Sequence, residues 1–255
     1  MFSPTIESRL AHRERPPRGH VMYQRWSRLL FAHWPVEPER IQRTLPHGLF
    51  ADSFENRCYL GVVPFFMERI RPRFLPPVPG ISWFLELNLR TYVHDAEGRA
   101  GVWFYSLDAG QSLAVALGRG LFHLPYFRAD MTAAMEGGKL VYESGRRGTA
   151  AHAHDRVSYA PPVGPWLTAK PGSWEFFLLE RYLLFAHERR RGRLVSGQVH
   201  HPPYPFAPVA IGSFDADFTP AFTAAGFGPP NGAPCSLLYS PGVNVRIFST
   251  NSSDY

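Results

Sequence analysis

The sequence is poor in lysine and cysteine and contains no long apolar run. Only Lys139 and Lys170 are lysines among 27 basic residues, and an arginine bias follows genomic base composition as well as function. The net charge of +6 is therefore weak support for a nucleic-acid partner, and without a recognised binding module we predict none. Cys58 and Cys235 have no metal-like spacing and form no disulfide framework, which favours a reduced, cytoplasmic chain. Signal-peptide and membrane-spanning patterns are missing too, so we predict no membrane partner.

Common catalytic motifs are also missing. The sequence has no nucleophile elbow, no phosphate-binding loop and no zinc-protease helix motif. Gly118-Arg119-Gly120 resembles the start of a dinucleotide fingerprint, but His stands at position 123 and no βαβ pattern surrounds it. His152, His154 and the pair at 200–201 lie beside loop signals, without acids or cysteines at matching spacing. We predict neither a metal nor a cofactor.

What the chain does have is 45% hydrophobic residues with 25 prolines and 22 glycines, a composition typical of a folded, turn-rich β protein. We predict one mainly β domain with a few helices (α+β) over 21–250, preceded by a flexible basic arm (1–20) and followed by a tail (251–255). A proline-rich extended loop or lid is expected at 71–80. The predicted strands are 22–36, 58–70 with a break at Pro64, 82–93, 101–109, 139–144, 156–160, 194–200 and 237–248. The predicted helices are 37–45, 111–121, 174–184 and 217–225.

The segment 82–93 carries the densest chemistry. Its residues alternate with a period of two, so Leu85, Leu87 and Leu89 share one face of a strand. The other face presents Phe84, Glu86, Asn88, Arg90 and Tyr92. Two interpretations are open from the pattern. Either this is a sheet whose polar face meets water, or the polar row points into a cavity and binds a ligand.

Several motifs resemble one known family. In order they are Leu29-Leu30-Phe31-Ala32-His33-Trp34-Pro35-Val36, Tyr59-Leu60-Gly61-Val62-Val63-Pro64-Phe65, the strand 84–93, Phe104-Tyr105-Ser106-Leu107-Asp108-Ala109, Leu124-Pro125-Tyr126-Phe127, Pro171-Gly172-Ser173, Glu180-Arg181-Tyr182 and His200-His201-Pro202. Their order, over residues 22 to 250, resembles the YqjF-like family of uncharacterised conserved proteins. The resemblance implies the fold of acetoacetate decarboxylase, an antiparallel cone-shaped barrel around an internal cavity, with the polar row facing inward.

The same resemblance permits a test of the reaction. Acetoacetate decarboxylase forms a Schiff base on a lysine that a second lysine follows, and the corresponding positions here are Tyr126 and Phe127. An aromatic ring cannot form an imine, and Lys139 and Lys170 lie in turn-like surroundings. Schiff-base decarboxylation is therefore not expected of this chain.

These observations favour a small-molecule pocket. Arg90 would bind a carboxylate or another polar anion, Glu86 would accept a hydrogen bond or act as a general base, and Asn88 and Tyr92 would orient the ligand. Buried charges need partners, and the candidate partners, which we also count as ligand-binding residues, are Ser106, Asp108, Tyr126, Arg128, Glu180, Arg181 and Tyr182.

Two alternatives remain open. One is a non-catalytic carrier or sensor with the same pocket, and the other is a purely structural network of buried charges. For Glu180 and Arg181, an ion pair on one helix is the expected role. The sequence leaves open whether the chain is an enzyme and whether it forms a homo-oligomer.

Overall fold

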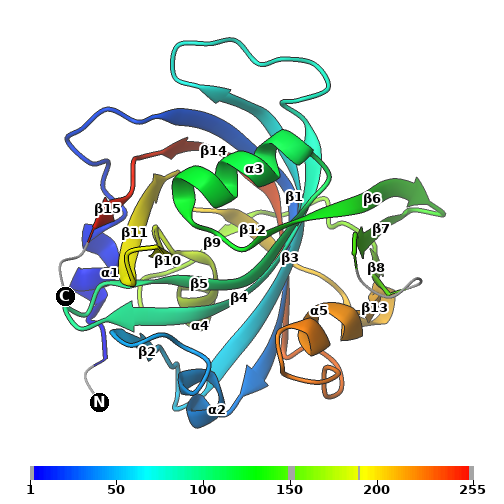
Figure 1. The fold of residues 1–255 in the computed structure, drawn as a ribbon. Helices are drawn as coiled ribbons and strands as arrows, with labels where there is room; N and C mark the ends of the chain where they lie inside the picture. Colours follow the sequence, from blue (N-terminus) through cyan, green and yellow to red (C-terminus); the bar gives the residue numbers. More distant parts are fainter. Residues whose placement is uncertain (1–2, 149–152, 189, 253–255) are drawn as a thin grey trace.

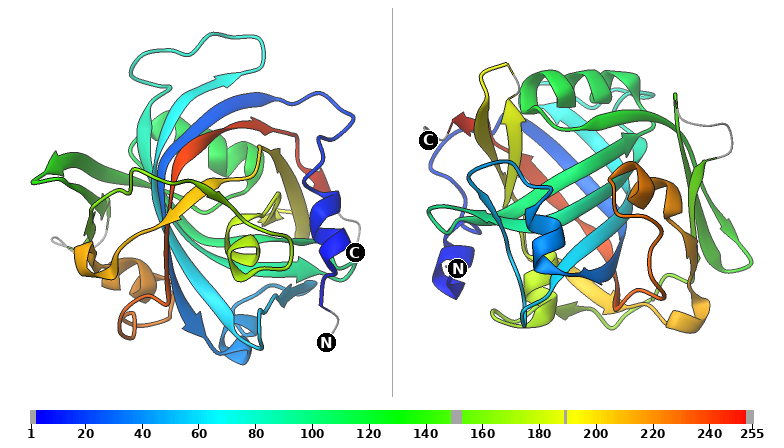
Figure 2. Two further views of the ribbon diagram at one scale, coloured as in Figure 1. Left: turned by 180° about the vertical axis from the view of Figure 1, so that it is seen from behind. Right: turned by 60° about the horizontal axis from the view of Figure 1, so that its bottom comes forward.

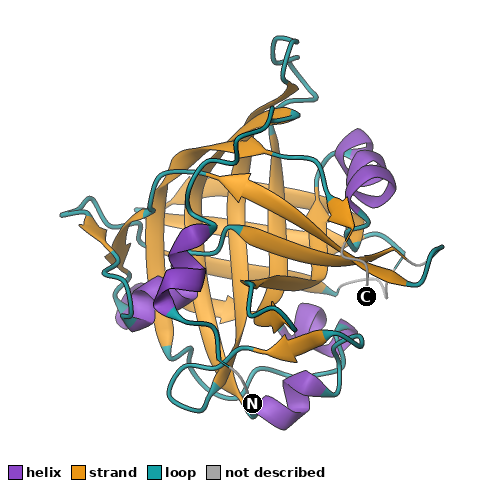
Figure 3. Cartoon of the chain, turned by 90° about the vertical axis from the view of Figure 1, so that its left-hand side faces the viewer, coloured by secondary structure: helices purple, strands orange, loops and turns teal. Residues whose placement is uncertain are grey.

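The structure is a computed structural model that describes residues 3–148, 153–188 and 190–252. In this part, short helices surround one strongly curved sheet (Figures 1 and 3), the mainly β class that the sequence predicts. The helices are α1 (Ile6–Ala11), α2 (Pro38–Gln42), α3 (Ser112–Phe122), α4 (Trp174–Leu179), the 3₁₀ helix η1 (Ile211–Ser213) and α5 (Thr219–Ala224). None of these described helices is long and apolar enough to cross a membrane.

The strands are β1 (Met22–Val36), β2 (Leu49–Ala51), β3 (Cys58–Pro72), β4 (Phe84–Asp95), β5 (Ala100–Ala109), β6 (Tyr126–Glu136), β7 (Lys139–Arg146), β8 (His154–Tyr159), β9 (Leu167–Thr168), β10 (Leu183–Glu188), β11 (Arg193–His200), β12 (Pro205–Pro208), β13 (Asp215–Asp217), β14 (Ser236–Ile247) and β15 (Asn251–Ser252). The sheet closes on itself through β5, β10, β11, β14, β1, β3 and β4, because β4 pairs again with β5. Figure 2 shows this ring from behind and from its lower end. Within the ring only β10 and β5 run parallel. Closure leaves an interior for inward-facing side chains.

The break predicted at Pro64 is wrong, since β3 runs unbroken from Cys58 to Pro72. The register between β1 and β3 shifts between the pairs Ser27–Phe66 and Ala32–Val62, so Pro64 lies beside an irregular stretch of β1. A proline is tolerated where the ladder of hydrogen bonds is already interrupted.

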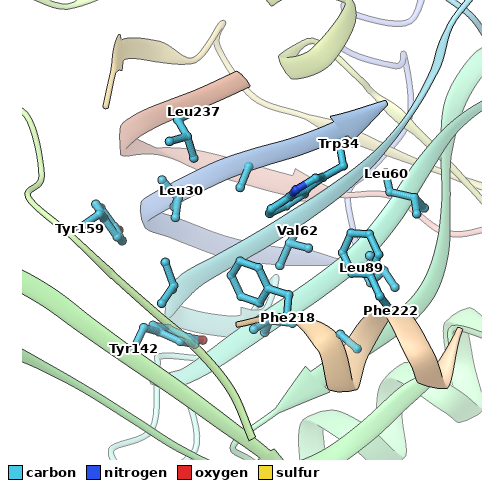
Figure 4. Close-up of a cluster of buried hydrophobic side chains, with 14 of the residues drawn as sticks. Leu30, Trp34, Leu60, Val62, Leu89, Tyr142, Tyr159, Phe218, Phe222 and Leu237 are labelled. Carbon is cyan, nitrogen blue, oxygen red and sulfur yellow. The ribbon is translucent and has the colours of Figure 1, made fainter. Parts of the chain in front are cut away.

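Strands β6, β7, β8 and β13 extend from the ring as an outer arm. Between this arm, α5 and the outer face of the ring lies the largest apolar cluster (Figure 4), which includes Leu30, Trp34, Leu60, Val62, Leu87, Leu89, Tyr142, Tyr159, Phe218, Phe222 and Leu237. The hydroxyl of Tyr142 donates to the carbonyl oxygen of Glu86 at 2.8 Å. This contact ties the outer arm to the backbone of β4.

Both ends of the described chain contain a short regular element. The arm contains α1, and its Arg9 donates to both carboxylate oxygens of Asp52 at 2.6 and 2.8 Å. Because the Asp52 side chain is fully buried, this bidentate pair gives the segment a defined position. Of the tail, Asn251 and Ser252 form β15 beside β11, and residues 253–255 lie outside the described residues.

Helix α4 is shorter than predicted. It begins at Trp174, where the Ser173 side chain accepts a hydrogen bond from the Phe176 N–H, and it ends at Leu179. The chain then continues as β10 from Leu183, so 180–182 lies in a connection rather than in a helix. Phe177 and Leu178 on the buried face of α4 pack against three residues of the ring, which are Tyr59, Tyr92 and Val102.

Candidate functional site

Strand β4 is buried on both faces from Glu86 to Asp95, so its polar row does not lie on the outer surface of the protein. Phe84, Glu86, Asn88 and Arg90 line one pocket, whereas Leu87 and Leu89 pack in the apolar cluster on the other side of the sheet. The strand geometry separates these two sets because successive side chains point to opposite faces. The sequence therefore predicts correctly which side chains of β4 face the pocket and which face the apolar cluster.

The pocket has a volume of about 120 Å³, enough for several water molecules or a small organic molecule. Its polar side chains come from β4 together with Gln24, Tyr126 and Tyr204. The remaining lining is almost wholly apolar and comes from β1, β3, α3 and neighbouring strands: Met22, Trp26, Leu29, Val63, Phe65, Met67, Ile70, Phe104, Leu107, Ala114, Leu117, Gly118, Phe122, Leu124, Leu184, Val199 and Ile247. A short polar strip therefore faces an apolar chamber.

Glu86 is the buried acid of this strip, with 2% of its surface exposed. The Tyr126 hydroxyl lies 3.2 Å from Oε2 of Glu86 and donates to it. Burial raises the pKa of the Glu86 carboxyl to about 8, although the hydrogen bonds with Tyr126 and Asn88 oppose this shift. Glu86 therefore holds a proton at neutral pH and can donate it.

Tyr126 reaches Glu86 because β5 and β6 are parallel neighbours joined by α3, which places Tyr126 beside Leu107 of β5. Gly118 of α3 packs against the Tyr126 ring, and a Cβ at this position would overlap the ring atoms. The glycine that resembles the start of a dinucleotide fingerprint thus serves helix packing. Burial and the neighbouring Glu86 carboxyl both raise the pKa of Tyr126, so its phenol stays neutral.

Arg90 is the buried cation of the strip, with 8% of its surface exposed. In the described part of the chain it forms no ion pair with an Asp or Glu, and its Nε has no hydrogen-bond partner. Its Nη2 lies 3.4 Å from the Leu178 carbonyl oxygen, and its guanidinium lies 5.4 and 5.7 Å from the ring centres of Phe31 and Tyr92. A buried guanidinium in this state has unused donors for an anion.

Glu86 and Arg90 do not pair with each other. They are four positions apart on β4, which is about 13 Å along a strand. Asn88 lies between them, and its buried Oδ1 has no hydrogen-bond partner among the described residues. The acid and the cation therefore mark two ends of one strip, with an amide between them.

A β-bulge moves two predicted residues away from the pocket. Leu89 pairs with Ser106 but Arg90 pairs with Phe104, so Tyr105 is an extra residue on β5. The strict alternation expected for 101–109 fails at this point. Phe104 and Leu107 both line the pocket.

Beyond the bulge, Ser106 and Asp108 face the outer arm. Asp108 pairs there with Arg146 at 2.8 Å, and burial raises its pKa although Arg146 opposes the shift. Arg128 also lies outside the pocket, where its Nε donates to the Ser112 hydroxyl at 3.1 Å. Three predicted ligand-binding residues therefore do not line the pocket, namely Ser106, Asp108 and Arg128.

Tyr92 and Arg181 lie behind the pocket. The Tyr92 hydroxyl donates to the Leu178 carbonyl and accepts from His33 Nε2, both at 2.7 Å. Arg181 lies 3.0 Å from Oδ2 of Asp52, so it does not form the predicted ion pair with Glu180. Burial lowers the pKa of Arg181 to about 10, and Asp52 opposes this shift.

Glu180 and Tyr182 form a second buried group at the same end. The Tyr182 hydroxyl and the Tyr204 N–H, the latter at 3.0 Å, both donate to the Glu180 carboxylate. Burial raises the pKa of Glu180 despite these hydrogen bonds. Of this group only Tyr204 lines the pocket. His201 stacks on the Tyr182 ring and contacts the Tyr204 ring at a tilted angle.

Sequence reasoning missed Gln24, Trp26 and Tyr204 as pocket residues, and it did not find Asp52 or His33 as parts of the buried network. His33 stands inside the first family motif, which was the only signal available for it. Neither lysine lines the pocket. The described residues contain no group of three or more His, Cys, Asp or Glu side chains that could hold a metal, and His152 lies outside them.

With this geometry in place, comparison with known proteins identifies the family. Residues 23–244 match the model of domain-of-unknown-function family 2071, described as an uncharacterized conserved protein. The chain belongs to this family. It is 39% identical over 184 residues to the uncharacterized protein YqjF of Bacillus subtilis (strain 168), covering 72% of this chain and 74% of YqjF.

Solved structures show the fold. An acetoacetate decarboxylase-like enzyme from Sphingomonas wittichii RW1 matches with a TM-score of 0.63 and 14% identity, over 93% of this chain and 94% of that chain. Acetoacetate decarboxylase from Legionella pneumophila gives 0.63 and 11% identity, over 93% and 88%. The enduracididine biosynthesis enzyme MppR complexed with pyruvate gives 0.60 and 14% identity, over 95% and 94%. The chain therefore has the acetoacetate decarboxylase-like fold.

Proposed function

We propose that the pocket binds a small-molecule carboxylate with an apolar body, and that Arg90 holds the carboxylate. The observation that carries this proposal is the buried Arg90 guanidinium, which lines the pocket without an Asp or Glu partner in the described chain. An unpaired charge away from water is costly, and a bound anion removes that cost.

The surrounding charges support an anionic ligand. Arg9 and Arg181 share the single carboxylate of Asp52, and the charge of Arg90 contributes to lowering the pKa of Arg181. Arg90 also lowers the pKa of the fully buried His33, although burial is the larger cause. This end of the strip has more positive than negative charge, as an anion site requires.

The length of the strip and the walls define the ligand further. A carboxylate at Arg90 directs the ligand along Asn88, whose free Oδ1 accepts a hydrogen bond, toward Glu86. Protonated Glu86 donates a hydrogen bond to a carbonyl or hydroxyl oxygen there. The apolar walls fit an aliphatic or aromatic body. MppR, which has a similar fold, has a solved structure in complex with pyruvate, a small oxo acid.

The chemistry that these residues support is proton transfer. Glu86 can protonate an oxygen or carbon atom that gains negative charge, with Tyr126 hydrogen-bonded to the carboxylate that remains. No lysine lines the pocket, so the reaction does not proceed through an imine on this chain. Two free cysteines are consistent with the proposed cytoplasmic location.

Calorimetric titration with small carboxylic acids tests the proposal. Pyruvate, 2-oxobutyrate, phenylpyruvate and benzoate would be compared with their neutral amides. We expect at least one acid to bind and its amide to bind about tenfold more weakly or not at all. Arg90→Gln should abolish binding of the acid, while Arg128→Gln, which removes a charge outside the pocket, should leave the affinity unchanged.

Equal affinity of Arg90→Gln and the unchanged protein for the acid would contradict the proposal, provided that thermal unfolding shows both to be folded. Arg90→Lys keeps the charge and should retain part of the affinity. Incubation of the bound acid with the protein, followed by product analysis with Glu86→Gln as control, then separates a catalyst from a carrier or sensor.

A further inference from the structure

The loop between β3 and β4, residues 73–83, projects from one end of the molecule (Figure 1, cyan). It carries large apolar side chains in water. Phe74 is 86% exposed, Leu75 57% and Val78 47%, and Ile81 and Trp83 are exposed as well. Several large exposed apolar side chains on one short loop are typical of a surface that binds a partner.

Helix α3 adds a second apolar row at the same end of the molecule (Figures 1 and 3). Leu113, Leu117 and Leu121 are spaced by four residues, so they follow one side of the helix, and each is at least 40% exposed. Leu117 also lines the pocket, as do Ile70 and Phe84 at the base of the loop. The apolar surface thus continues into the mouth of the pocket.

Positive charge lies directly beside the loop. Arg15, Arg18 and Arg73 line a surface notch of about 500 Å³ that has no acidic residue in its lining. The notch has a defined shape, because the Arg73 N–H donates to the Val21 carbonyl at 3.0 Å. The Arg73 guanidinium also packs so closely on Gly19 that a Cβ there would lie 2.7 Å from Nη1.

We propose that this end of the protein binds the surface of a membrane that contains anionic lipids. This departs from the prediction of no membrane partner, which rested on the missing membrane-spanning pattern, because binding to a lipid surface needs no spanning segment. The apolar loop enters the interfacial layer, and the arginines of the notch bind lipid phosphates at its edge. Two partners could cover the apolar loop, a lipid surface or a second copy of the chain, and the positive charge of the notch favours the lipid surface. A two-fold contact through the same loops would bring two arginine clusters together, whereas an anionic lipid surface neutralises them.

Vesicle flotation with the full chain tests this proposal. Vesicles of phosphatidylcholine alone would be compared with an equimolar mixture of phosphatidylcholine and phosphatidylglycerol, at low and at high salt. We expect binding to the anionic vesicles only, weakened by salt. The double variant Phe74→Ser, Leu75→Ser should bind at least about tenfold more weakly. Val163→Ser, which changes a 97% exposed apolar side chain between β8 and β9, should bind normally.

Charge and depth have separate controls. Arg73→Gln should lower the partition coefficient about fivefold, while Arg57→Gln, an exposed arginine beside the opposite end of β3, should not change it. Lipids brominated on their acyl chains should quench the fluorescence of the bound protein. Trp83→Phe should lose most of this quenching, because Trp83 is the tryptophan of the loop.

Failure of the unchanged protein to float with anionic vesicles would overturn the proposal, as would equal flotation of the Phe74, Leu75 double variant. A concentration-dependent dimer in light scattering that the double variant loses, without vesicle binding, would assign the surface to a second copy instead. Vesicle binding is tested separately from the proposed pocket ligand, because Arg90 lies in the pocket and not in the loop or the notch. Arg90→Gln should therefore bind vesicles like the unchanged protein.

Discussion

The Tyr126 hydroxyl lies 3.2 Å from Oε2 of Glu86, and the Tyr126 ring packs on Gly118 of α3. Tyr126 therefore contacts the acid of the pocket, and α3, which also lines the pocket, fixes the position of Tyr126. Because the hydrogen bond from Tyr126 lowers the pKa of Glu86 against the effect of burial, α3 influences the protonation of the acid.

The first prediction concerns Glu86 and pH. Its carboxyl has a pKa of about 8 in the native protein and an ordinary value of 4.5 when unfolded, so native protein binds more protons between these values. Below pH 4.5 the ionisation of Glu86 does not reduce the free energy of unfolding. Between pH 4.5 and about 8, Glu86 makes the free energy of unfolding fall as the pH rises, by up to about 1.4 kcal/mol per pH unit. In urea unfolding from pH 5 to pH 9, Glu86→Gln should show a shallower decline than the unchanged protein.

Glu143→Gln is the control, because it removes an exposed carboxylate paired with Arg156. It should keep the decline of the unchanged protein. If Glu86→Gln keeps the same slope as well, the pKa of Glu86 is not raised by folding.

The second prediction concerns α3. Gly118→Ala places a Cβ against the Tyr126 ring, so the ring must move and its hydrogen bond to Glu86 must weaken. The pKa of Glu86, followed by carbon NMR of its carboxyl group, should then rise above about 8. Gly120→Ala is a matched control two residues away, since a Cβ there meets no atom within 4 Å. An equal effect of both substitutions would mean that helix propensity, not contact with Tyr126, is responsible.

The third prediction concerns the buried carboxylate of Asp52, which pairs with both Arg9 and Arg181. Asp52→Asn leaves two guanidiniums without a counter-charge, and Arg181 is almost fully buried. We expect the free energy of unfolding to fall by about 3–5 kcal/mol, measured by urea denaturation. Asp130→Asn breaks the exposed pair with Arg147 and should have little effect. A small loss for Asp52→Asn would show that solvent reaches this cluster.

The fourth prediction concerns stability in acid. Burial lowers the pKa of His201 from 6.5 to about 4, so below pH 6.5 the unfolded chain binds a proton that the native protein does not. Stability should fall as the pH drops from 6.5 toward 4, by up to about 1.4 kcal/mol per unit from this group. His201→Phe keeps a ring between Tyr182 and Tyr204 and should reduce that slope in urea unfolding. An unchanged slope would place the acid sensitivity in other groups, such as His33.

The alternation of residues in β4 was enough to predict which side chains share a face. Side-chain direction along a strand depends only on the local backbone, so the common face of Glu86, Asn88 and Arg90 needed no knowledge of the fold. The same reasoning failed one strand later, because the bulge at Tyr105 arises from pairing between β4 and β5. The residue type at position 105 does not indicate a bulge. The bulge turns Ser106 and Asp108 away from the pocket.

The partners of the buried charges were also beyond the sequence. Glu180 and Arg181 are adjacent in the chain and invited an ion pair, yet Arg181 pairs with Asp52, 129 positions earlier, which also binds Arg9. The motif order did predict the family and its fold, since a resemblance over most of the chain carries the long-range information that single motifs lack.

For this protein, the sequence by itself determined the mainly β class and the two faces of the central strand, both properties of local pattern and residue chemistry. The tertiary structure alone decided that Glu86 and Arg90 lie apart along one strip, that Tyr126 contacts the acid, and that Arg90 has no carboxylate partner in the described chain. Closure of the ring is the physical reason. It encloses the polar row of β4 between strands from distant parts of the chain. Strand β6 pairs with β5 outside the ring and places Tyr126 beside Glu86.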